Sequence, residues 1–441
     1  MRKFPAITNT SFSSGASRRS LRSNVAAAVP VLRNAGGSKR PSQFPIWLLL
    51  TGILLIPSSL AIRLSGEGVK FTPGRAAIAL LVLPALSKLL RGGRHFLLSD
   101  ILVFFTSAWM IGSRFSDDGL NDSAVAEVIE LMGGYVVARA YFFGRPALQE
   151  FMRAFKILTA IVIVFASLEP FAGTNVVTAI TSALFHTDVF GTQYRYGIVR
   201  AQSTIEDSEL YGTLCCIAGA LCLYLEPAGL RRYLWVGFCF FGCLLSISSG
   251  PLGVFAIVVA TYVYDRMFKQ FSWRWKAYGM TIGGLVASVY LIAAKPTSWL
   301  ITHLTLDPST GFFRLYVFDY CFEHIAVYPL KGWGFGAIGG DDFLSNVTVD
   351  SVWIVVALRF GLPMMFLLLL TNIATFFRPK ARLRGNTRDP YIDDAGTGFT
   401  FALSCFMAIG LTVHYWNAIW MLWAVCLGVR ASIKESQLHI A

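Results

Sequence analysis

The chain has 441 residues, of which 55% are hydrophobic and only 14% are charged, and its formal net charge is +13. Ordinary globular proteins carry about 25% charged residues, so this composition excludes a soluble enzyme. Lipid accepts this much apolar surface when every backbone polar group is paired inside helices or a closed barrel. The apolar stretches are continuous runs and do not alternate as barrel strands do, so the predicted fold class is all-α, a polytopic helical membrane protein.

The first 45 residues form a basic segment rich in Ser, Ala and Gly. It holds eight Lys and Arg residues and no Asp or Glu. We expect residues 1–45 to form a disordered cytoplasmic tail beside anionic lipid. A mitochondrial-type targeting peptide has a similar composition and is the alternative interpretation. Because the basic residues do not cluster on a folded face, no nucleic-acid partner is expected.

Residues 46–441 are predicted to form a single transmembrane domain of about 12 helices, each near the length that crosses the hydrocarbon. The expected spans are 46–62, 75–90, 97–112, 124–144, 155–173, 208–226, 233–248, 250–264, 277–294, 361–377, 395–412 and 416–433. In this layout most of the 38 Lys and Arg residues lie on one side. The cytoplasmic side collects such residues, so both termini are expected to be cytoplasmic.

No cofactor or metal site is expected. Every Cys except Cys321 lies in an apolar run, where Cys behaves as a small hydrophobic residue, and no zinc-type spacing occurs. The chain also lacks a phosphate-binding loop, a dinucleotide fingerprint and an HExxH motif.

Two longer outer loops, 174–207 and 295–360, are expected to hold the chemistry. The first ends in YRYGIVRAQSTIEDSELYG, which brings Arg195, Arg200, Glu206, Asp207 and Glu209 to the mouth of a span. Charge at this position is costly unless it is paired or hydrated. The alternative is an interfacial anchor whose side chains reach the lipid headgroups.

The second loop contains TGFFRLYVFDYCFEHIAVYPLKGWGFGAIG, residues 310–339. Its spacing predicts an amphipathic helix that carries Arg314. A glycine-rich turn with Lys331, Trp333 and Gly334 follows, and its backbone either approaches a ligand closely or simply reverses the chain. Asp350 then precedes an apolar helix, where it is either a functional carboxylate or a helix cap.

This ordered set resembles the O-antigen ligase and Wzy-type polysaccharide polymerase superfamily, which are GT-C-like membrane glycosyltransferases of bacteria. The similarity covers roughly residues 190–375. It rests on Arg200, the Ser-Gly junction SISSGPLG, the segment GFFRLYVFDYCFEHIAVYPLKGWGFG and the polar residue before WIVVALRFGLP. Ligases usually carry His before that last helix, whereas this chain has Asp350 and Ser351, which fits the exopolysaccharide polymerase branch better.

The resemblance implies a polyprenyl-diphosphate-linked oligosaccharide, such as one on undecaprenyl diphosphate, as donor. It also implies an acceptor sugar hydroxyl, and transfer at the periplasmic face of the inner membrane by a metal-independent, inverting reaction. Family habit adds membrane lipid and a chain-length regulator protein as partners. The expected product is exopolysaccharide or O-antigen; transfer of glycan to the lipid A core by an O-antigen ligase is the alternative.

Within this framework, Arg200 and Arg314 are the candidates to bind the diphosphate, because a guanidinium grips phosphate oxygens by paired bonds and keeps its charge. Asp350 is the preferred catalytic base. The supporting substrate-binding candidates are Arg195, Glu206, Asp207, Lys331, Trp333 and Gly334.

A transporter or flippase for lipid-linked glycans is the alternative from another class, since such proteins also have about twelve spans and intramembrane charges. Most outer arginines lie in loops, which favours the enzyme. Arg139 lies inside an expected span and keeps the transporter hypothesis open.

Overall fold

The computed structural model describes residues 43–63, 70–91, 93–118, 121–187, 191–294, 296, 298–299, 302, 306–335, 348–377 and 389–439. The predicted tail up to residue 42 and the predicted glycines at positions 336, 339 and 340 lie outside these residues. Within the described part nearly every regular element is a helix, so the all-α fold class is confirmed.

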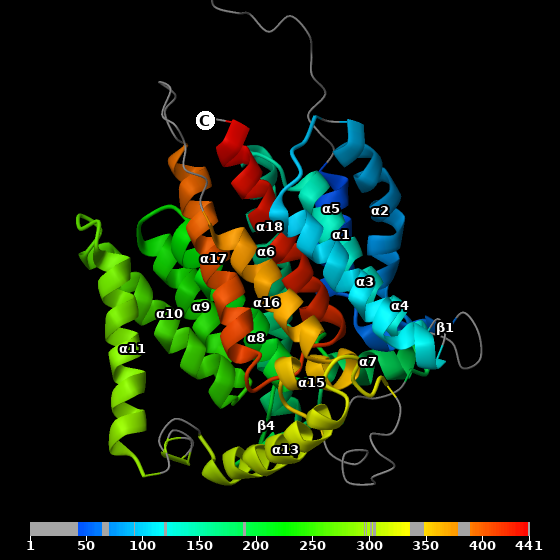
Figure 1. Ribbon diagram of the computed structural model, residues 1–441, viewed down its shortest axis with the longest axis vertical. Helices are drawn as coiled ribbons and strands as arrows, with labels where there is room; N and C mark the ends of the chain where they lie inside the picture. The colour runs from blue at the N-terminus through cyan, green and yellow to red at the C-terminus, as the bar shows by residue number, and fades with distance from the viewer. Residues whose placement is uncertain are drawn as a thin grey trace, which may run out of the picture. The chain divides into compact units, whose positions relative to one another are not determined.

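The helices follow one another along the whole described chain (Figure 1). Their bounds are α1 Phe44–Leu54, α2 Pro73–Arg91, α3 Leu98–Asp118, α4 Asp122–Val128, the π-helix η2 Ile129–Gly133, α5 Gly134–Tyr141, α6 Arg145–Ala172, α7 Val176–Phe185, α8 Ser208–Leu225, α9 Leu230–Leu245, α10 Ser249–Met267, α11 Arg274–Ile292, α13 Pro308–Val327, α15 Val352–Phe360, α16 Leu362–Phe376, α17 Pro390–Ile409 and α18 Asn417–His439. A 3₁₀ turn, η1 Ser58–Leu60, follows α1.

Two short antiparallel strand pairs complete the described structure. The strand β1 Ile62–Arg63 pairs with β2 Lys70–Phe71, and β3 Tyr194–Arg195 pairs with β4 Ile198–Val199. Both pairs are hairpins of two residues per strand, so they shape loops and build no sheet layer.

A helix lies at each of the expected span positions, with α4, η2 and α5 together at the fourth. Among the described residues, α2, α6 and α8 are long and apolar enough to cross a membrane, and α1, α7 and α16 are shorter apolar helices. These helices give the chain a membrane-like character, while the count of twelve crossings stays a prediction.

The first helix is shorter than expected. Helix α1 ends at Leu54 instead of continuing to residue 62. Pro57 lies just beyond this end. Proline has no N–H for the helical ladder and disfavours helical backbone in the residue before it, which stops the helix there. Helix α7 lies within the outer loop 174–207, where no helix was predicted.

Helix α8 lies at the centre of the packing. Every residue from Leu210 to Leu225 is buried, and α8 packs against α9, α10 and α17. Close approach is possible because Gly219 has no Cβ: one would lie 2.5 Å from the ring of Phe255 on α10. Small residues at helix contacts bring backbones together in this way in membrane proteins.

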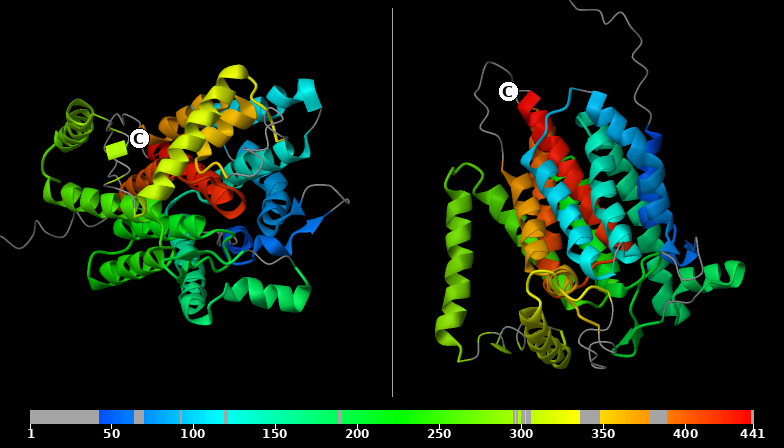
Figure 2. Two further views of the ribbon diagram at one scale, coloured as in Figure 1. Left: turned by 90° about the horizontal axis from the view of Figure 1, so that it is seen from below. Right: turned by 45° about the vertical axis from the view of Figure 1, so that its right-hand side comes forward.

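Helix α13 crosses one end of the bundle together with α15, and the C-terminal end of α18 lies at the opposite end (Figures 1 and 2). Helix α11 stands at the edge and has no buried residue. All eight cysteines are unpaired thiols, and all are buried. The end of the bundle that α13 covers is the end where the loops with the predicted functional residues lie.

Candidate functional site

A cavity of about 540 Å³ lies at the α13 end of the bundle. Its wall is built by the segment that precedes α8, by α13, by residues before and within α15, and by the loop between α17 and α18. Several predicted site residues line it: Arg195, Arg200, Asp207, Arg314, Gly334 and Asp350. The two loops predicted to lie on the outer side thus contribute to one cavity.

Arg314 lies on α13 between two carboxylates from other elements. Its Nε donates to Asp350 Oδ2 at 2.9 Å, and its Nη2 donates to Glu209 Oε1 at 2.9 Å. Burial lowers the pKa of the Arg314 guanidinium, but Glu209 and Asp350 outweigh this effect and raise it above its usual value. The charge of Arg314 is therefore permanent, and two charge-assisted bonds fix its direction.

Asp350 is not a helix cap. The N-cap residue of α15 is Ser351, and the Asp350 carboxylate forms an ion pair with Arg314. The Asp350 side chain is 32% exposed, compared with 14% for Glu209. Of the two carboxylates on Arg314, Asp350 is therefore the one more open to a molecule in the cavity.

A β-hairpin sets Arg200 beside this ion-pair cluster. Tyr196 and Gly197 both have positive φ, 54° and 75°, between the paired strands β3 and β4. Such backbone is typical of a type I′ turn, which matches the twist of a two-residue hairpin. The hairpin returns the chain so that Arg195 and Arg200, on its two sides, both line the cavity.

Arg200 is buried and only partly bonded. Its Nε donates to the Ser246 carbonyl at 3.1 Å and its Nη1 donates to Gln193 Oε1 at 3.2 Å. Its Nη2 is buried, lies 3.5 Å from Glu209 Oε1 and makes no hydrogen bond within the described chain. Burial lowers the Arg200 pKa, yet a guanidinium remains protonated at neutral pH. One donor of a fixed cation is thus left for a ligand.

The Ser-Gly junction between α9 and α10 supplies acceptors for both loop arginines. Arg195 Nη1 donates to the Ile247 carbonyl at 2.8 Å, next to the Ser246 carbonyl that receives Arg200. Ile247 has φ 46°. A β-branched residue in this left-handed region is strained, and such strain gathers at functional sites. The junction predicted from SISSGPLG therefore orients the two arginines.

Asp207 stabilises the start of α8 beside the cavity. Its Oδ1 accepts from the Glu209 N–H at 2.7 Å as the N-cap of α8, and its Oδ2 accepts from Gln193 Nε2 at 2.6 Å. An N-cap carboxylate also suits the positive end of the helix dipole. Asp207 thereby fixes the first turn of α8, which holds Glu209.

Three predicted site residues do not line the cavity: Glu206, Lys331 and Trp333. Both carboxyl oxygens of Glu206 are buried, and burial raises the Glu206 pKa, a shift that Ser58 and Asn417 oppose. The Lys331 Nζ lies 5.6 Å from the centre of the Tyr328 ring. Trp333 Nε1 donates to the His324 carbonyl at 2.9 Å.

The glycine-rich turn approaches protein backbone closely. Gly332 has φ 67°, and a Cβ there would lie 2.5 Å from the Leu358 carbonyl oxygen. The Trp333 N–H donates to that same carbonyl at 2.6 Å. The described glycines of this turn thus join it to the end of α15, and Gly334 also lines the cavity.

The cavity is also lined by residues outside the predicted site set, among them Gln193, Glu209, Arg359 and His414. Glu209 stands in the quoted span-mouth segment, but its contact with both Arg200 and Arg314 depends on a fold that local spacing does not reveal. Arg359 pairs with Glu127 at 2.6 Å from inside an apolar helix. His414 lies in the short turn before α18. In the sequence, only the presence of a polar residue in this turn could have indicated a functional role.

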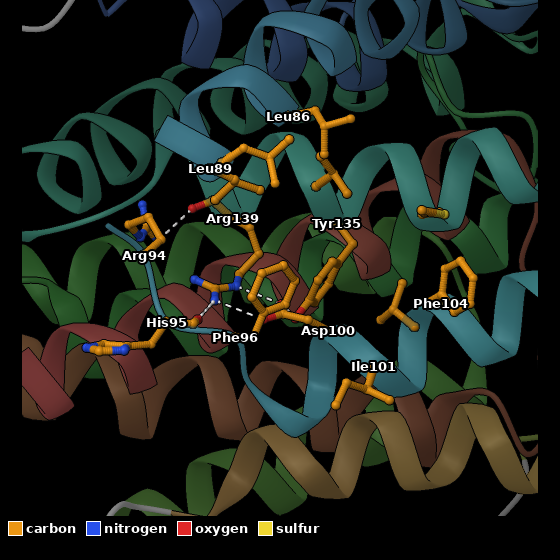
Figure 3. A pocket seen from close by; sticks show the side chains of 14 residues that line it. Leu86, Leu89, Arg94, His95, Phe96, Asp100, Ile101, Phe104, Tyr135 and Arg139 are labelled. Atoms are coloured by element: carbon orange, nitrogen blue, oxygen red, sulfur yellow. Dashed lines mark hydrogen bonds and ion pairs between the residues drawn. The ribbon is translucent and has the colours of Figure 1, made fainter. Parts of the chain in front are cut away.

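A second cavity, of about 300 Å³, lies at the other end, beside Arg139 (Figure 3). Arg139 pairs with Asp100 at 3.0 Å and with Glu435 at 2.5 Å, and Arg94 Nε donates to Glu435 at 2.8 Å. Tyr135 donates to Asp100 at 2.6 Å. The charges in this cluster are mutually paired. Arg139 therefore has a structural role that links α3, α5 and α18.

No family model matches the chain, and no curated protein matches it in sequence.

Proposed function

We propose that the chain is a membrane glycosyltransferase that joins lipid-linked oligosaccharide repeat units into exopolysaccharide or O-antigen at the periplasmic face of a bacterial inner membrane. The observation that carries the proposal is the convergence of Arg200 and Arg314 on Glu209 in one cavity, with Asp350 beside them. The sequence resemblance to the polymerase branch supports the same reaction.

The arginines fit a diphosphate. The polyprenyl diphosphate gains negative charge on the phosphate oxygen that was bonded to the anomeric carbon as this bond breaks, and fixed cations lower the energy of that state. Arg200 Nη2 is a buried donor without a hydrogen bond in the described chain. Arg314 is already oriented by two carboxylates. Neither cation needs to be reorganised when the charge develops.

The proposed donor also needs an apolar environment for its isoprenoid chain. Helix α8, which begins at this cavity, is among the helices long and apolar enough to cross a membrane. In this proposal, a lipid chain beside the exposed apolar helices of the bundle keeps the diphosphate at the α13 end. This arrangement supports the proposal of a membrane-anchored donor.

The reaction is a single displacement. The acceptor hydroxyl oxygen attacks the anomeric carbon, the bond from that carbon to the phosphate oxygen breaks, and its electron pair leaves with the polyprenyl diphosphate. The hydroxyl proton passes to the Asp350 carboxylate, the more open carboxylate on Arg314. Inversion at the anomeric carbon follows from one displacement.

The pairing of Arg139 weakens the transporter alternative, which depended on this residue as an intramembrane charge. Arg139 is paired with Asp100 and Glu435 at the end of α5, and it is not placed as an isolated charge in a translocation path. The arginines of the candidate site lie at the opposite end. Polymerase and ligase chemistry share this site, so the acceptor distinguishes them.

The test uses purified full-length protein and the lipid-linked oligosaccharide extracted from cells that lack this chain. We expect the protein to lengthen the oligosaccharide, and Arg314→Ala to reduce the rate by about 10²- to 10³-fold, the usual loss for one transition-state donor. Arg145→Ala is the matched control, because Arg145 is a 52% exposed arginine paired with Asp389 outside the cavity.

Lengthening by wild type and by Arg145→Ala, with loss in Arg314→Ala, supports the proposal. Transfer to lipid A core without lengthening assigns the ligase reaction instead. Undiminished activity in Arg314→Ala, or lipid movement across vesicles without any glycosidic bond formed, overturns the proposed function.

A further inference from the structure

The loop between α17 and α18 contributes a separate part of the cavity wall. Residues 410–416 connect the two helices, and Val413, His414 and Trp416 line the cavity. None of these three belongs to the arginine and carboxylate cluster. The cavity therefore has a region with neutral polar and aromatic character next to its charged region.

His414 presents an unused polar atom. Its Nδ1 is buried and makes no hydrogen bond within the described chain. A buried polar atom without a partner is costly, and such atoms in native structures generally have a ligand or water as partner. Because the His414 side chain also lines the cavity, a sugar hydroxyl group bound there is a suitable partner for its imidazole.

His414 is also held neutral. Burial lowers the pKa of its imidazole to about 3, and the positive charge of Arg359 acts in the same direction. A neutral imidazole has one donor and one acceptor nitrogen. A sugar hydroxyl can donate a hydrogen bond to the acceptor nitrogen or accept one from the donor nitrogen. A neutral ring does not attract the diphosphate.

Trp416 adds an aromatic surface beside the imidazole. Its side chain is 37% exposed, and its ring centre lies 5.4 Å from that of His414. An indole ring offers a broad apolar face that packs against the C–H face of a pyranose. A polar ring atom and an aromatic face at this spacing suit one sugar ring.

We propose that His414 and Trp416 form a subsite for a single sugar ring, next to the arginine cluster that binds the diphosphate. This inference rests on the proposed function and names where its carbohydrate lies. The ring belongs either to the donor glycan or to the acceptor glycan, and the chemistry of recognition is shared by both.

The test is a binding measurement on purified protein with three probes. They are the lipid-linked oligosaccharide from cells lacking this chain, the same lipid after mild acid has removed its glycan, and the released glycan added to protein saturated with that glycan-free lipid. The variants are His414→Ala, His414→Gln, Trp416→Ala and Trp416→Phe. His186→Asn is the control, because His186 is exposed outside the cavity.

We expect His414→Ala and Trp416→Ala to bind glycan about five- to tenfold more weakly, the loss for one hydrogen bond or one packed ring. His414→Gln and Trp416→Phe should recover part of this loss. All variants should bind the glycan-free lipid as wild type does, because the arginines remain. A loss seen with the lipid-linked glycan alone assigns the donor ring; a loss with released glycan assigns the acceptor ring.

Unchanged glycan binding in His414→Ala and Trp416→Ala overturns the subsite. Equal loss for glycan-free lipid also overturns it, because that result shows a merely structural role. The proposed function fails in a different way, namely when wild type does not bind the glycan-free lipid or when Arg314→Ala binds it equally well.

Discussion

Glu209 and Arg314 are 105 residues apart in the chain, yet Glu209 Oε1 accepts a hydrogen bond from Arg314 Nη2 at 2.9 Å. The same oxygen lies 3.5 Å from Arg200 Nη2. One carboxylate on the first turn of α8 thus holds two guanidinium groups together. It joins α13, which crosses the end of the bundle, to the most deeply buried helix.

Glu209→Gln tests this bridge. The amide keeps the size of the side chain but removes the charge that attracts both arginines, so we expect diphosphate binding and the rate to fall at least about tenfold. Dissociation constants for the glycan-free lipid provide the measurement. Glu209→Asp should also bind poorly, because the shorter side chain does not reach both groups. Wild-type affinity in Glu209→Gln contradicts the bridging role.

Asp350→Asn separates proton transfer from binding. Asn accepts a bond from Arg314 but takes no proton, so we expect the turnover rate to fall by about 10²- to 10⁴-fold, the usual contribution of a general base. Binding of the glycan-free lipid should change little. Single-turnover rates measured beside binding constants check this. Normal turnover in Asp350→Asn removes Asp350 as the proton acceptor.

Glu206→Gln should change the pH dependence of stability. Burial raises the pKa of Glu206 above its usual value of 4.5, so the folded protein binds the Glu206 proton more tightly than the unfolded chain does. Folding loses stability as pH rises from that usual value through the raised one. Glu206→Gln should therefore unfold at a higher temperature than wild type near pH 8.

The same variant should match wild type near pH 4, where both states carry the proton. Thermal unfolding in detergent at the two pH values measures the difference. An advantage for Glu206→Gln that is equal at both pH values would show that protonation of Glu206 has no part in it.

Gly361→Ala should destabilise the turn between α15 and α16. Gly361 has φ 82°, and an added Cβ would overlap the Leu330 carbonyl group. Backbone would have to move, so we expect a loss of about 1–3 kcal/mol, the cost of comparable strain. Gly237→Ala on α9 is the control, since a Cβ there meets nothing within 4 Å. Alanine should be neutral or slightly stabilising in that helix.

Unfolding temperatures of the two glycine variants provide the comparison. If Gly361→Ala is as stable as Gly237→Ala, the close contact between Gly361 and the glycine-rich turn is not needed.

Most of the helices were predictable because they are apolar runs ended by Gly, Pro or charge; α7 was not predicted. The ends of the helices were less predictable. Pro57 stops α1 early, whereas α6 begins at Arg145 and Pro146, ten residues before the expected start. Pro at the first turn favours helix initiation, a local signal that hydropathy does not register.

The sequence predicted which types of residue form the site, but it did not predict which of them contact one another. Arg200, Arg314 and Asp350 stand out as polar residues beside apolar runs, and all line one cavity. Glu209 and His414 acquire their places only through packing between distant segments. Lys331 and Trp333 follow the same sequence pattern as Gly334, but the turn directs them to Tyr328 and His324.

The buried thiols have a practical consequence. Since all eight cysteines are inaccessible, a membrane-impermeant maleimide should leave the native chain unlabelled, and no residue has to be removed first. A single cysteine introduced on the surface is then the only thiol that the maleimide labels. Labelling intact cells would report, position by position, which face of the membrane each connection occupies.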